Sequence, residues 1–269
     1  MPVCDHFFDG TEEDYALLEK IYQAFPQCLF VEYPFIPDKI SKRLFKVVDF
    51  AHFWHSLSRL IGSQFIEESV ENVLFLDADE IPEAKRFTEW LECSDYACHT
   101  VLKLANYWYF REHYYQSEQW EDSIVFAQKR ALEPHLLLRQ EERNAIYDSL
   151  PGPKRRMVMG VDGHPMFHHY SWVRTEAEML KKVHSWSHKN DRAWDKLVTE
   201  EFSRPFQGIE FVNKNPCKTV KPAFSVPKDL PLFKTQGQAN VIRMDAQAVL
   251  STIKKGGGSF WNLIFRRFP

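Results

Sequence analysis

The feature that most constrains the fold of this chain is a short apolar run that ends in an acidic cluster. Residues 73–76 are Val-Leu-Phe-Leu, and Asp77, Asp79 and Glu80 follow almost at once. Four consecutive apolar residues are typical of a strand buried on both faces, so we expect a central strand of an α/β sheet here. Ligands bind beyond the carboxyl ends of the strands in open α/β sheets. The acidic cluster is therefore the first candidate for a functional site.

The segments that precede this run alternate between helix and strand patterns. Thr11 predicts the start of a helix that ends before Pro26. Residues 28–33 predict a strand, and the apolar spacing over residues 44–65 predicts a second helix. Such alternation is typical of an α/β fold, so we expect a mostly parallel sheet flanked by helices.

The later part of the chain is less regular. Residues 101–115 are rich in aromatic side chains and predict strands or a rigid connection. Thr175 and Glu178 form a capping-box pattern that predicts a helix. Prolines recur beyond that helix. We expect one α/β domain over residues 1–202, followed by a proline-rich extension and a basic, aromatic tail over residues 203–269.

Composition excludes several classes of protein. The 269 residues are 44% hydrophobic and carry a net charge of −3, so the chain is neither disordered nor a bulk nucleic-acid binder. Only 10 residues are glycine and no glycine-rich phosphate loop occurs, which disfavours Rossmann dinucleotide and P-loop sites. The five cysteines form no C-x-x-C pair and indicate reduced thiols. No apolar run of 18 residues and no signal peptide are visible, so we expect a cytoplasmic protein without a membrane-spanning helix.

The spacing of the acidic cluster favours a metal and a diphosphate. Carboxylates as close as Asp77 and Asp79 repel each other, and they ionise together only beside a cation or hydrogen-bond donors. Oxygen ligands suit Mg²⁺ or Mn²⁺, which commonly bind one or two protein carboxylates together with substrate phosphates. The alternative is an acidic turn in which Asp79 or Glu80 caps the next helix.

Residues 76–82, Leu-Asp-Ala-Asp-Glu-Ile-Pro, resemble the D-x-D motif of glycosyltransferases with the GT-A fold, in particular of the broad glycosyltransferase family 2. The resemblance implies a GT-A-like, Rossmann-like sheet and a nucleotide-diphosphate sugar as donor. It also implies that Asp77 and Asp79 hold a Mn²⁺ or Mg²⁺ ion that bridges the donor phosphates, with Asp77 among the donor contacts.

The first residues carry a weaker part of the same resemblance. Asp5 and Asp9 resemble the acidic turn that follows the second strand of the family, whose carboxylates contact the base or the ribose. A counterpart of the first strand of the family is then missing. Either Met1 is a late start, or the chain has lost part of its donor site and is a degenerate relative.

A second resemblance concerns the catalytic base. Glu121 and Asp122 resemble the E-D pair that supplies this base in inverting members of the family. The resemblance implies that Asp122, with Glu121 as its substitute, removes the proton from the acceptor hydroxyl. The sugar is expected to pass through an oxocarbenium-like state, as in glycoside hydrolysis.

His168, His169 and Arg174 form a further candidate cluster. GT-A enzymes often add a C-terminal histidine to the metal or the diphosphate, so the resemblance implies that role for His168 or His169. Adjacent side chains of a strand face opposite ways, so only one of the two would reach the site. Arg174 is a candidate donor to a phosphate. The alternative is a pair of surface histidines in an aromatic turn.

The expected partners follow from this family. The acceptor is a carbohydrate, a lipid or a protein, and no nucleic acid is expected. Residues 260–269 are basic and aromatic and either dock on the body as a helix or contact a membrane surface or a partner. Two other functions stay open, namely a metal-dependent phosphohydrolase or nucleotidyl enzyme, and a non-catalytic sugar- or partner-binding module on a decayed scaffold.

Overall fold

The computed structural model describes residues 1–7, 10–40, 42, 45, 50–138, 142–186, 189, 191–224 and 238–257. The chain forms two compact units. The first unit combines Met1–Glu68, Glu133–Glu142 and Ser225–Pro269, and the second combines Ser69–Leu132 and Arg143–Phe224. Residues 203–224 thus pack with the second unit, and the domain boundary expected at residue 202 stays a prediction.

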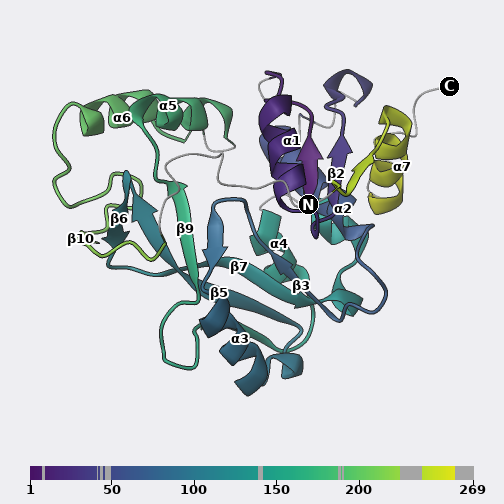
Figure 1. Cartoon of the computed structure of the whole chain (residues 1–269), viewed down its shortest axis with the longest axis horizontal. Coiled ribbons are helices and arrows are strands. Elements are labelled where there is room, and N and C mark those ends of the chain that lie inside the picture. The colour runs from purple at the N-terminus through teal and green to yellow at the C-terminus, as the bar shows by residue number, and fades with distance from the viewer. Residues whose placement is uncertain are drawn as a thin grey trace. The chain divides into compact units, whose positions relative to one another are not determined.

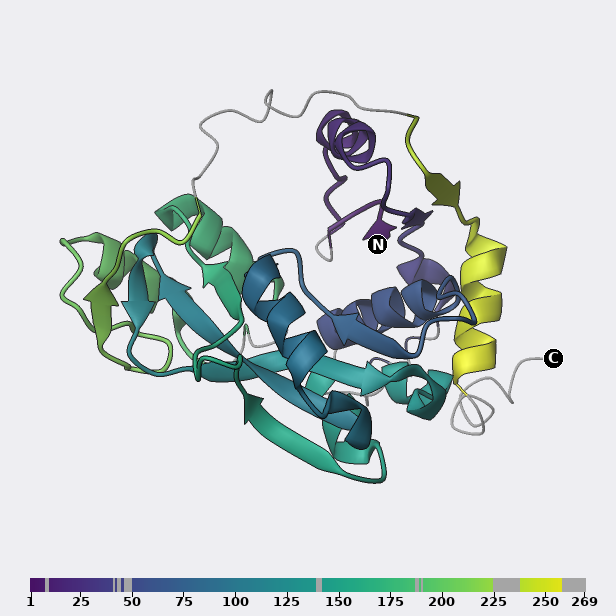
Figure 2. The same cartoon turned by 60° about the horizontal axis from the view of Figure 1, so that its bottom comes forward.

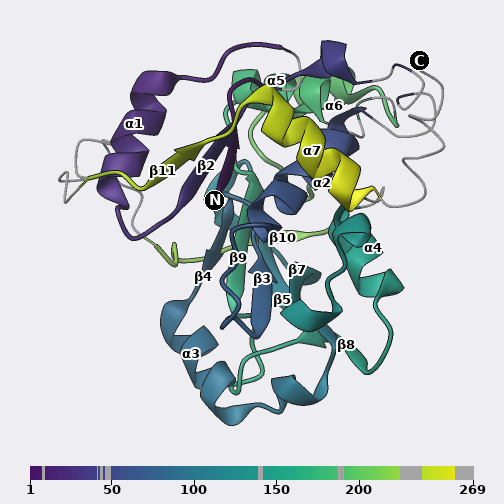
Figure 3. The same cartoon turned by 90° about the vertical axis from the view of Figure 1, so that its right-hand side faces the viewer.

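The first unit contains a three-stranded parallel sheet. The central strand β2 (Phe30–Tyr33) lies between β1 (Pro2–Cys4) and β11 (Val241–Arg243), as Figure 3 shows. α1 (Tyr15–Ala24) connects β1 to β2, so this part of the chain has the strand–helix–strand order of an α/β fold. The N-cap of α1 is Asp14, whose carboxylate accepts from the Leu17 N–H at 3.1 Å, and the expected cap Thr11 lies outside the helix.

Three helical segments of the first unit pack together. They are α2 (Phe50–Ser63), the short 3₁₀ turn η5 (Pro134–Leu138) and α7 (Ala246–Gly256). The apolar spacing that predicted α2 is confirmed over the described residues, because its buried side chains include Trp54, Leu57 and Ile61. Gly256 allows α7 to approach closely, since a Cβ atom there would lie 2.6 Å from Leu60 Cδ2.

The second unit is built on a curled eight-stranded sheet, which Figures 1 and 2 show from two directions. The strand order is β10-β6-β5-β7-β3, and β8, β9 and β4 extend it because β5 also pairs with β8 and β9, and β9 pairs with β4. The strands are β3 (Asn72–Phe75), β4 (Glu80–Pro82), β5 (Val101–Phe110), β6 (Glu112–Ser117), β7 (Glu121–Gln128), β8 (Lys154–Val158), β9 (Phe167–Trp172) and β10 (Cys217–Thr219).

The expectation of a mostly parallel sheet is wrong for this unit. Only the pairings of β5 with β8 and β9 are parallel, and the others are antiparallel. The strands predicted over residues 101–115 are confirmed as β5 and β6, but they form a tight hairpin. Arg111 alone separates them and adopts a left-handed backbone with φ 59°. Antiparallel strands need only such a short connection, whereas parallel ones need a long crossover.

The apolar run that was expected to be central is also placed differently. Among the described residues β3 pairs only with β7, so it is the edge strand of this unit's sheet. Its residues Val73 and Leu74 are half-buried, and Leu76 is exposed. The acidic cluster nevertheless begins at the carboxyl end of this strand, as expected.

Two apolar clusters form the core of the second unit. One contains Trp90, Leu104, Phe126 and Phe167 and packs α3 (Ala84–Cys93) against the sheet. The other joins the sheet to α5 and α6, and its members are Trp108, Phe110, Trp172, Met179, Val183, Trp194 and Val198. The aromatic residues of these two clusters therefore stabilise the fold by packing.

The remaining elements of the second unit are helical. The predicted capping box is confirmed, because Thr175 and Glu178 make both of its hydrogen bonds at the start of α5. The helical elements of the second unit, besides α3, are η3 (Tyr96–Cys98), η4 (Lys129–Ala131), α4 (Glu142–Ser149), α5 (Glu176–Ser185) and α6 (Trp194–Phe202). The first unit also contains the short 3₁₀ turn η1 (Pro37–Lys39). Within the part of the chain that the structure describes, no helix is long and apolar enough to cross a membrane. Residues 260–269 lie outside that part.

Candidate functional site

A buried ion pair holds the loop that carries the D-x-D motif. The Glu80 carboxylate is fully buried and accepts two hydrogen bonds from the Arg143 guanidinium, at 2.5 and 2.9 Å. It also accepts from the Asp77 N–H at 2.8 Å and from Ser123 Oγ at 3.0 Å. The Glu80 N–H in turn donates to the Asp77 carbonyl at 3.0 Å. Glu80 is therefore the residue that shapes the loop, and it is not available to a ligand.

The two carboxylates of the motif lie at the surface of the same loop. The side chain of Asp77 is 41% exposed and that of Asp79 is 30% exposed. Asp77 Oδ2 lies 3.1 Å from Arg143 Nη2, and the Asp79 backbone carbonyl accepts from the Tyr170 N–H at 2.9 Å.

The alternative interpretation of the acidic cluster, as the cap of the next helix, does not fit this geometry. The N-cap of α3 is Glu83, which makes no capping hydrogen bond, and Glu80 lies in β4.

The two histidines of β9 face opposite ways. His168 has a partner at both ring nitrogens, because Nδ1 lies 2.7 Å from Tyr109 Oη and Nε2 lies 2.8 Å from Glu83 Oε1. Burial lowers the pKa of His168, although the Glu83 carboxylate opposes this. A neutral imidazole with both nitrogens engaged is a structural group, so the structure places His168 away from Asp77 and Asp79.

His169 lies between two carboxylates of the candidate site. Its Nε2 atom is 3.8 Å from Asp79 Oδ1, and its Nδ1 atom is 3.5 Å from Glu121 Oε2. The Nδ1 atom is buried and makes no hydrogen bond to any described residue. Burial alone would lower the pKa of His169, but the surrounding carboxylates, Glu121 first, raise it above its usual value. His169 is thus the member of the pair that faces the D-x-D motif.

Glu121 and Asp122 begin β7 and also face opposite ways. Both oxygens of the buried Asp122 carboxylate are in ion pairs, with Lys103 Nζ at 2.9 Å and Arg156 Nε at 2.8 Å. Burial alone would raise the pKa of Asp122, but the bonds from Arg156 and Lys103 outweigh it and hold the pKa below its usual value. The Glu121 side chain is 34% exposed and lies on the His169 side. The structure therefore brings Glu121, and not Asp122, to the D-x-D motif.

Two cations complete the cluster. Arg174 Nη2 lies 3.7 Å from Asp79 Oδ2, and Arg174 Nε donates to the Ser171 carbonyl at 3.0 Å. The hydroxyl of the same Ser171 lies 2.8 Å from Lys182 Nζ on α5.

The sequence analysis included Arg174 and missed Lys182. A signal was present, because Lys182 falls on the same face of α5 as the apolar Met179 and Val183, where a lysine is unexpected. Arg143, which holds the loop, was missed as well. It lies in the charged run Glu-Glu-Arg of residues 141–143, which gives no local signal.

The donor atoms around Asp79 suit a divalent cation. Two carboxylates and one imidazole are ligands that Mn²⁺ accepts, and Mg²⁺ needs only one or two protein carboxylates beside substrate phosphates. Glu121 lies near the other ring nitrogen of His169, with its Oε2 atom 3.5 Å from Nδ1. Among the described residues no three His, Cys, Asp or Glu side chains are arranged as a metal site by themselves. An ion at this place would need further ligands, such as the oxygens of a phosphate.

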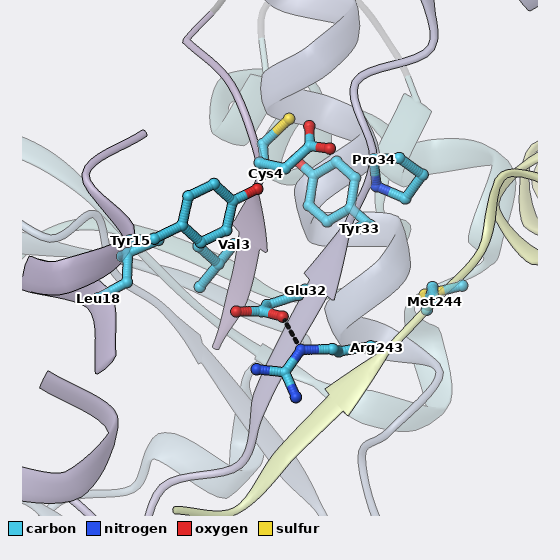
Figure 4. Close-up of a pocket in the computed structure, with 10 residues that line it drawn as sticks. Val3, Cys4, Tyr15, Leu18, Glu32, Tyr33, Pro34, Arg243 and Met244 are labelled. Carbon is cyan, nitrogen blue, oxygen red and sulfur yellow. Dashed lines mark ion pairs between the residues drawn. The ribbon is translucent and has the colours of Figure 1, made fainter. Parts of the chain in front are cut away.

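The first unit has a pocket of its own at the carboxyl ends of its parallel strands. The pocket has a volume of about 250 Å³, and Asp5, Tyr15 and the Glu32–Arg243 ion pair are among its lining residues. Figure 4 shows Glu32 between the Tyr15 ring and Arg243. An aromatic ring beside carboxylates suits a flat ligand with hydroxyl groups, such as a nucleoside.

Of the two N-terminal candidate residues, Asp5 and Asp9, the structure describes Asp5. Asp5 lines this pocket, and one of its carboxylate oxygens accepts from the Phe35 N–H at 2.6 Å and lies 2.7 Å from His6 Nδ1. Asp9 lies outside the described residues.

Comparison with known proteins adds no family to this geometry. No family model matches the chain, and no curated protein matches it. The resemblance to glycosyltransferases therefore rests on the sequence motifs and on the arrangement of Asp77, Asp79, Glu121, His169 and Arg174.

Proposed function

We propose that the chain is a glycosyltransferase with a GT-A-like fold that moves a sugar from a nucleotide-diphosphate sugar to an acceptor hydroxyl. The observation that carries the proposal is the convergence of four segments in the second unit. The loop after β3 brings Asp79, β7 brings Glu121, β9 brings His169, and the turn before α5 brings Arg174. Acidic, imidazole and guanidinium groups in one partly exposed cluster suit a site that handles a diphosphate and a proton.

The proposed catalytic base is Glu121 rather than Asp122. A base must reach the acceptor hydroxyl and must be able to take its proton. Asp122 is buried, and its two ion pairs stabilise its ionised form, so it is a poor acceptor for a proton. Glu121 is partly exposed and lies next to His169. In the E-D pair, Glu121 is therefore the proposed base, and Asp122 stabilises the sheet through its two ion pairs.

The proposed reaction inverts the anomeric centre. The acceptor oxygen forms a bond to the anomeric carbon while the bond from that carbon to the diphosphate oxygen breaks, and its electron pair leaves with the diphosphate. Glu121 takes the proton of the acceptor hydroxyl. Arg174 donates to a phosphate oxygen on which charge develops.

Asp77, Asp79 and His169 are the residues that would hold Mn²⁺ or Mg²⁺. When bound there, the ion acts as a Lewis acid that neutralises the charge of the diphosphate. The role that the resemblance implies for Asp5, as a contact of the base or the ribose, stays a prediction. The acceptor is a carbohydrate, a lipid or a protein. We retain the expectation of a cytoplasmic protein whose residues 260–269 either dock on the body or contact a membrane surface or a partner.

The experiment that tests this proposal compares Glu121→Gln with the neighbouring Asp122→Asn. Both variants remove one carboxylate and change the shape of the side chain very little. A screen of UDP- and GDP-sugars identifies the donor that the wild type turns over, and product stereochemistry is read by NMR. We expect an inverted product and a loss of kcat of about 10²-fold or more in Glu121→Gln, with donor binding retained.

Asp122→Asn serves as the matched variant, because its effect should appear in stability and not in the chemical step. A retained configuration, or turnover of Glu121→Gln within a few-fold of wild type, would contradict the proposed base. Nucleotide hydrolysis that is fast without any acceptor would favour a phosphohydrolase instead.

A further inference from the structure

Ser171, near the end of β9, holds two cations through two different atoms. Its carbonyl accepts from Arg174 Nε at 3.0 Å, and its hydroxyl lies 2.8 Å from Lys182 Nζ. Arg174 Nη2 lies 3.7 Å from Asp79 Oδ2, and Asp79 is also near enough to Lys182 to oppose the lowering of its pKa. The guanidinium and the ammonium are thus placed on the side where His169 meets Asp79 and Glu121.

The Lys182 ammonium has aromatic rings and a neutral hydroxyl as its neighbours rather than a carboxylate. Its ammonium lies 5.5 Å from the centroid of the Trp172 ring and 5.6 Å from that of the Trp186 ring. No carboxylate of the described residues lies within 4 Å of it, and its hydrogen bond to Ser171 is to a neutral group. A partly buried ammonium without an anion has lost hydration that a neutral hydroxyl replaces only in part.

The electrostatics of Lys182 agree with this geometry. Burial first, and the neighbouring Arg174 as well, lower the pKa of the Lys182 ammonium to about 8, although Asp79 and Asp77 oppose the change. An anion placed between Lys182 and Arg174 would relieve both unfavourable effects. Phosphate suits this place, because ammonium and guanidinium groups donate several hydrogen bonds to its oxygens.

We propose that Lys182 and Arg174, positioned by Ser171, bind the terminal phosphate of a nucleoside diphosphate. The inference rests on the proposed function, adds Lys182 to the proposed site and predicts which phosphate the site recognises. The terminal phosphate is the one bonded to the transferred sugar, so it takes up negative charge when that bond breaks. Two cations stabilise the reaction most where charge develops, which is at this phosphate rather than at the one bonded to the nucleoside. The site therefore distinguishes nucleoside diphosphates from monophosphates.

The test is calorimetric titration with UDP, GDP and CDP and with the matching monophosphates, with Mn²⁺ present throughout. Lys182→Met removes the charge and keeps the length of the side chain. Lys181→Met makes the same change at the exposed neighbouring position of α5 and is the matched control. We expect Lys182→Met to weaken binding of the preferred diphosphate about tenfold to a hundredfold, because a hydrogen bond to a charged group is lost. Binding of the monophosphate should change little, and Lys181→Met should bind both as the wild type does.

A second variant shows whether a loss of binding in Lys182→Met comes from the lost charge or from a folding defect. Lys182→Arg keeps the charge, and we expect it to retain more diphosphate affinity than Lys182→Met at an equal thermal midpoint. Equal affinity of wild type and Lys182→Met for the diphosphate would overturn the inference while leaving the proposed function intact. So would an equal loss for diphosphate and monophosphate.

Inorganic pyrophosphate separates this inference from the proposed function. If the wild type binds no nucleoside diphosphate, the proposed function fails, and the same titrations with pyrophosphate then decide the inference. Pyrophosphate binding that is weakened in Lys182→Met supports the two-cation site on its own. Absence of pyrophosphate binding, or binding that Lys182→Met leaves unchanged, overturns it.

Discussion

Replacing Glu80 by Gln should destabilise the second unit strongly, because Glu80 is a buried charge whose partners are all inside the protein. The carboxylate accepts from Asp77 N–H, from Ser123 Oγ and from two nitrogens of Arg143. An amide of the same shape keeps one acceptor oxygen and turns its NH₂ group toward groups that themselves donate. The Arg143 guanidinium also loses the carboxylate charge that it pairs with.

The expected loss is about 3–5 kcal/mol of the free energy of unfolding, which is typical when one partner of a buried ion pair is removed. This is a large part of the ~5–15 kcal/mol that stabilises a domain. Urea unfolding followed by tryptophan fluorescence measures it. Six of the eight tryptophans (Trp90, Trp108, Trp120, Trp172, Trp186 and Trp194) belong to the second unit, so the signal reports mainly on that unit.

Glu89→Gln is the matched control for this experiment. Glu89 pairs with Lys85 at 3.8 Å on the exposed face of α3, and such a surface pair contributes about 0–1 kcal/mol. The double variant Glu80→Gln with Arg143→Met should recover part of the loss, because it also removes the buried cation that has lost the Glu80 carboxylate. A loss below about 1 kcal/mol for Glu80→Gln alone would refute the conclusion that this ion pair holds the D-x-D loop.

Three further predictions concern the second unit. Asp122→Asn should lower the free energy of unfolding at neutral pH, because the pairing with Lys103 and Arg156 is lost. The folded pKa of Asp122 lies below its usual value, so urea unfolding should show the full difference in stability between wild type and variant above about pH 4, and a shrinking one as the pH falls further. Thr175→Ala should cost about 1 kcal/mol by removing the capping box of α5, and an unchanged urea midpoint would contradict the role of the cap. Met179→Ala should cost about 2–5 kcal/mol, since Met179 is fully buried between the sheet and α6, and a thermal midpoint within 1 °C of wild type would show that the packing there is not as described.

Local patterns predicted several elements because their causes are local. The capping box of α5 needs only Thr175 and Glu178, and the period of α2 needs only its own apolar residues. The opposite orientation of His168 and His169 followed from strand geometry alone. The same reasoning placed Asp77 and Asp79 at the end of a strand, which the structure confirms.

Local sequence patterns could not predict which strands pair with each other. Four apolar residues make β3 a strand, but they do not reveal that it pairs only with β7 among the described residues or that the hairpin at Arg111 makes the sheet largely antiparallel. For Glu121 and Asp122, the distinction depends on Lys103 and Arg156, which approach Asp122 from other strands. An E-D pair in the sequence carries no information about which of its members meets those cations.

Nucleotide binding to the D-x-D loop is the most direct test of the central claim. The full chain would be titrated calorimetrically with UDP, GDP and CDP in Mn²⁺ and again after addition of EDTA, using wild type, Asp79→Ala and the control Glu89→Ala. We predict that one nucleotide binds to the wild type and to Glu89→Ala, and that its binding disappears with EDTA and in Asp79→Ala. Absence of binding to the wild type, or binding that survives both EDTA and Asp79→Ala, would contradict the account.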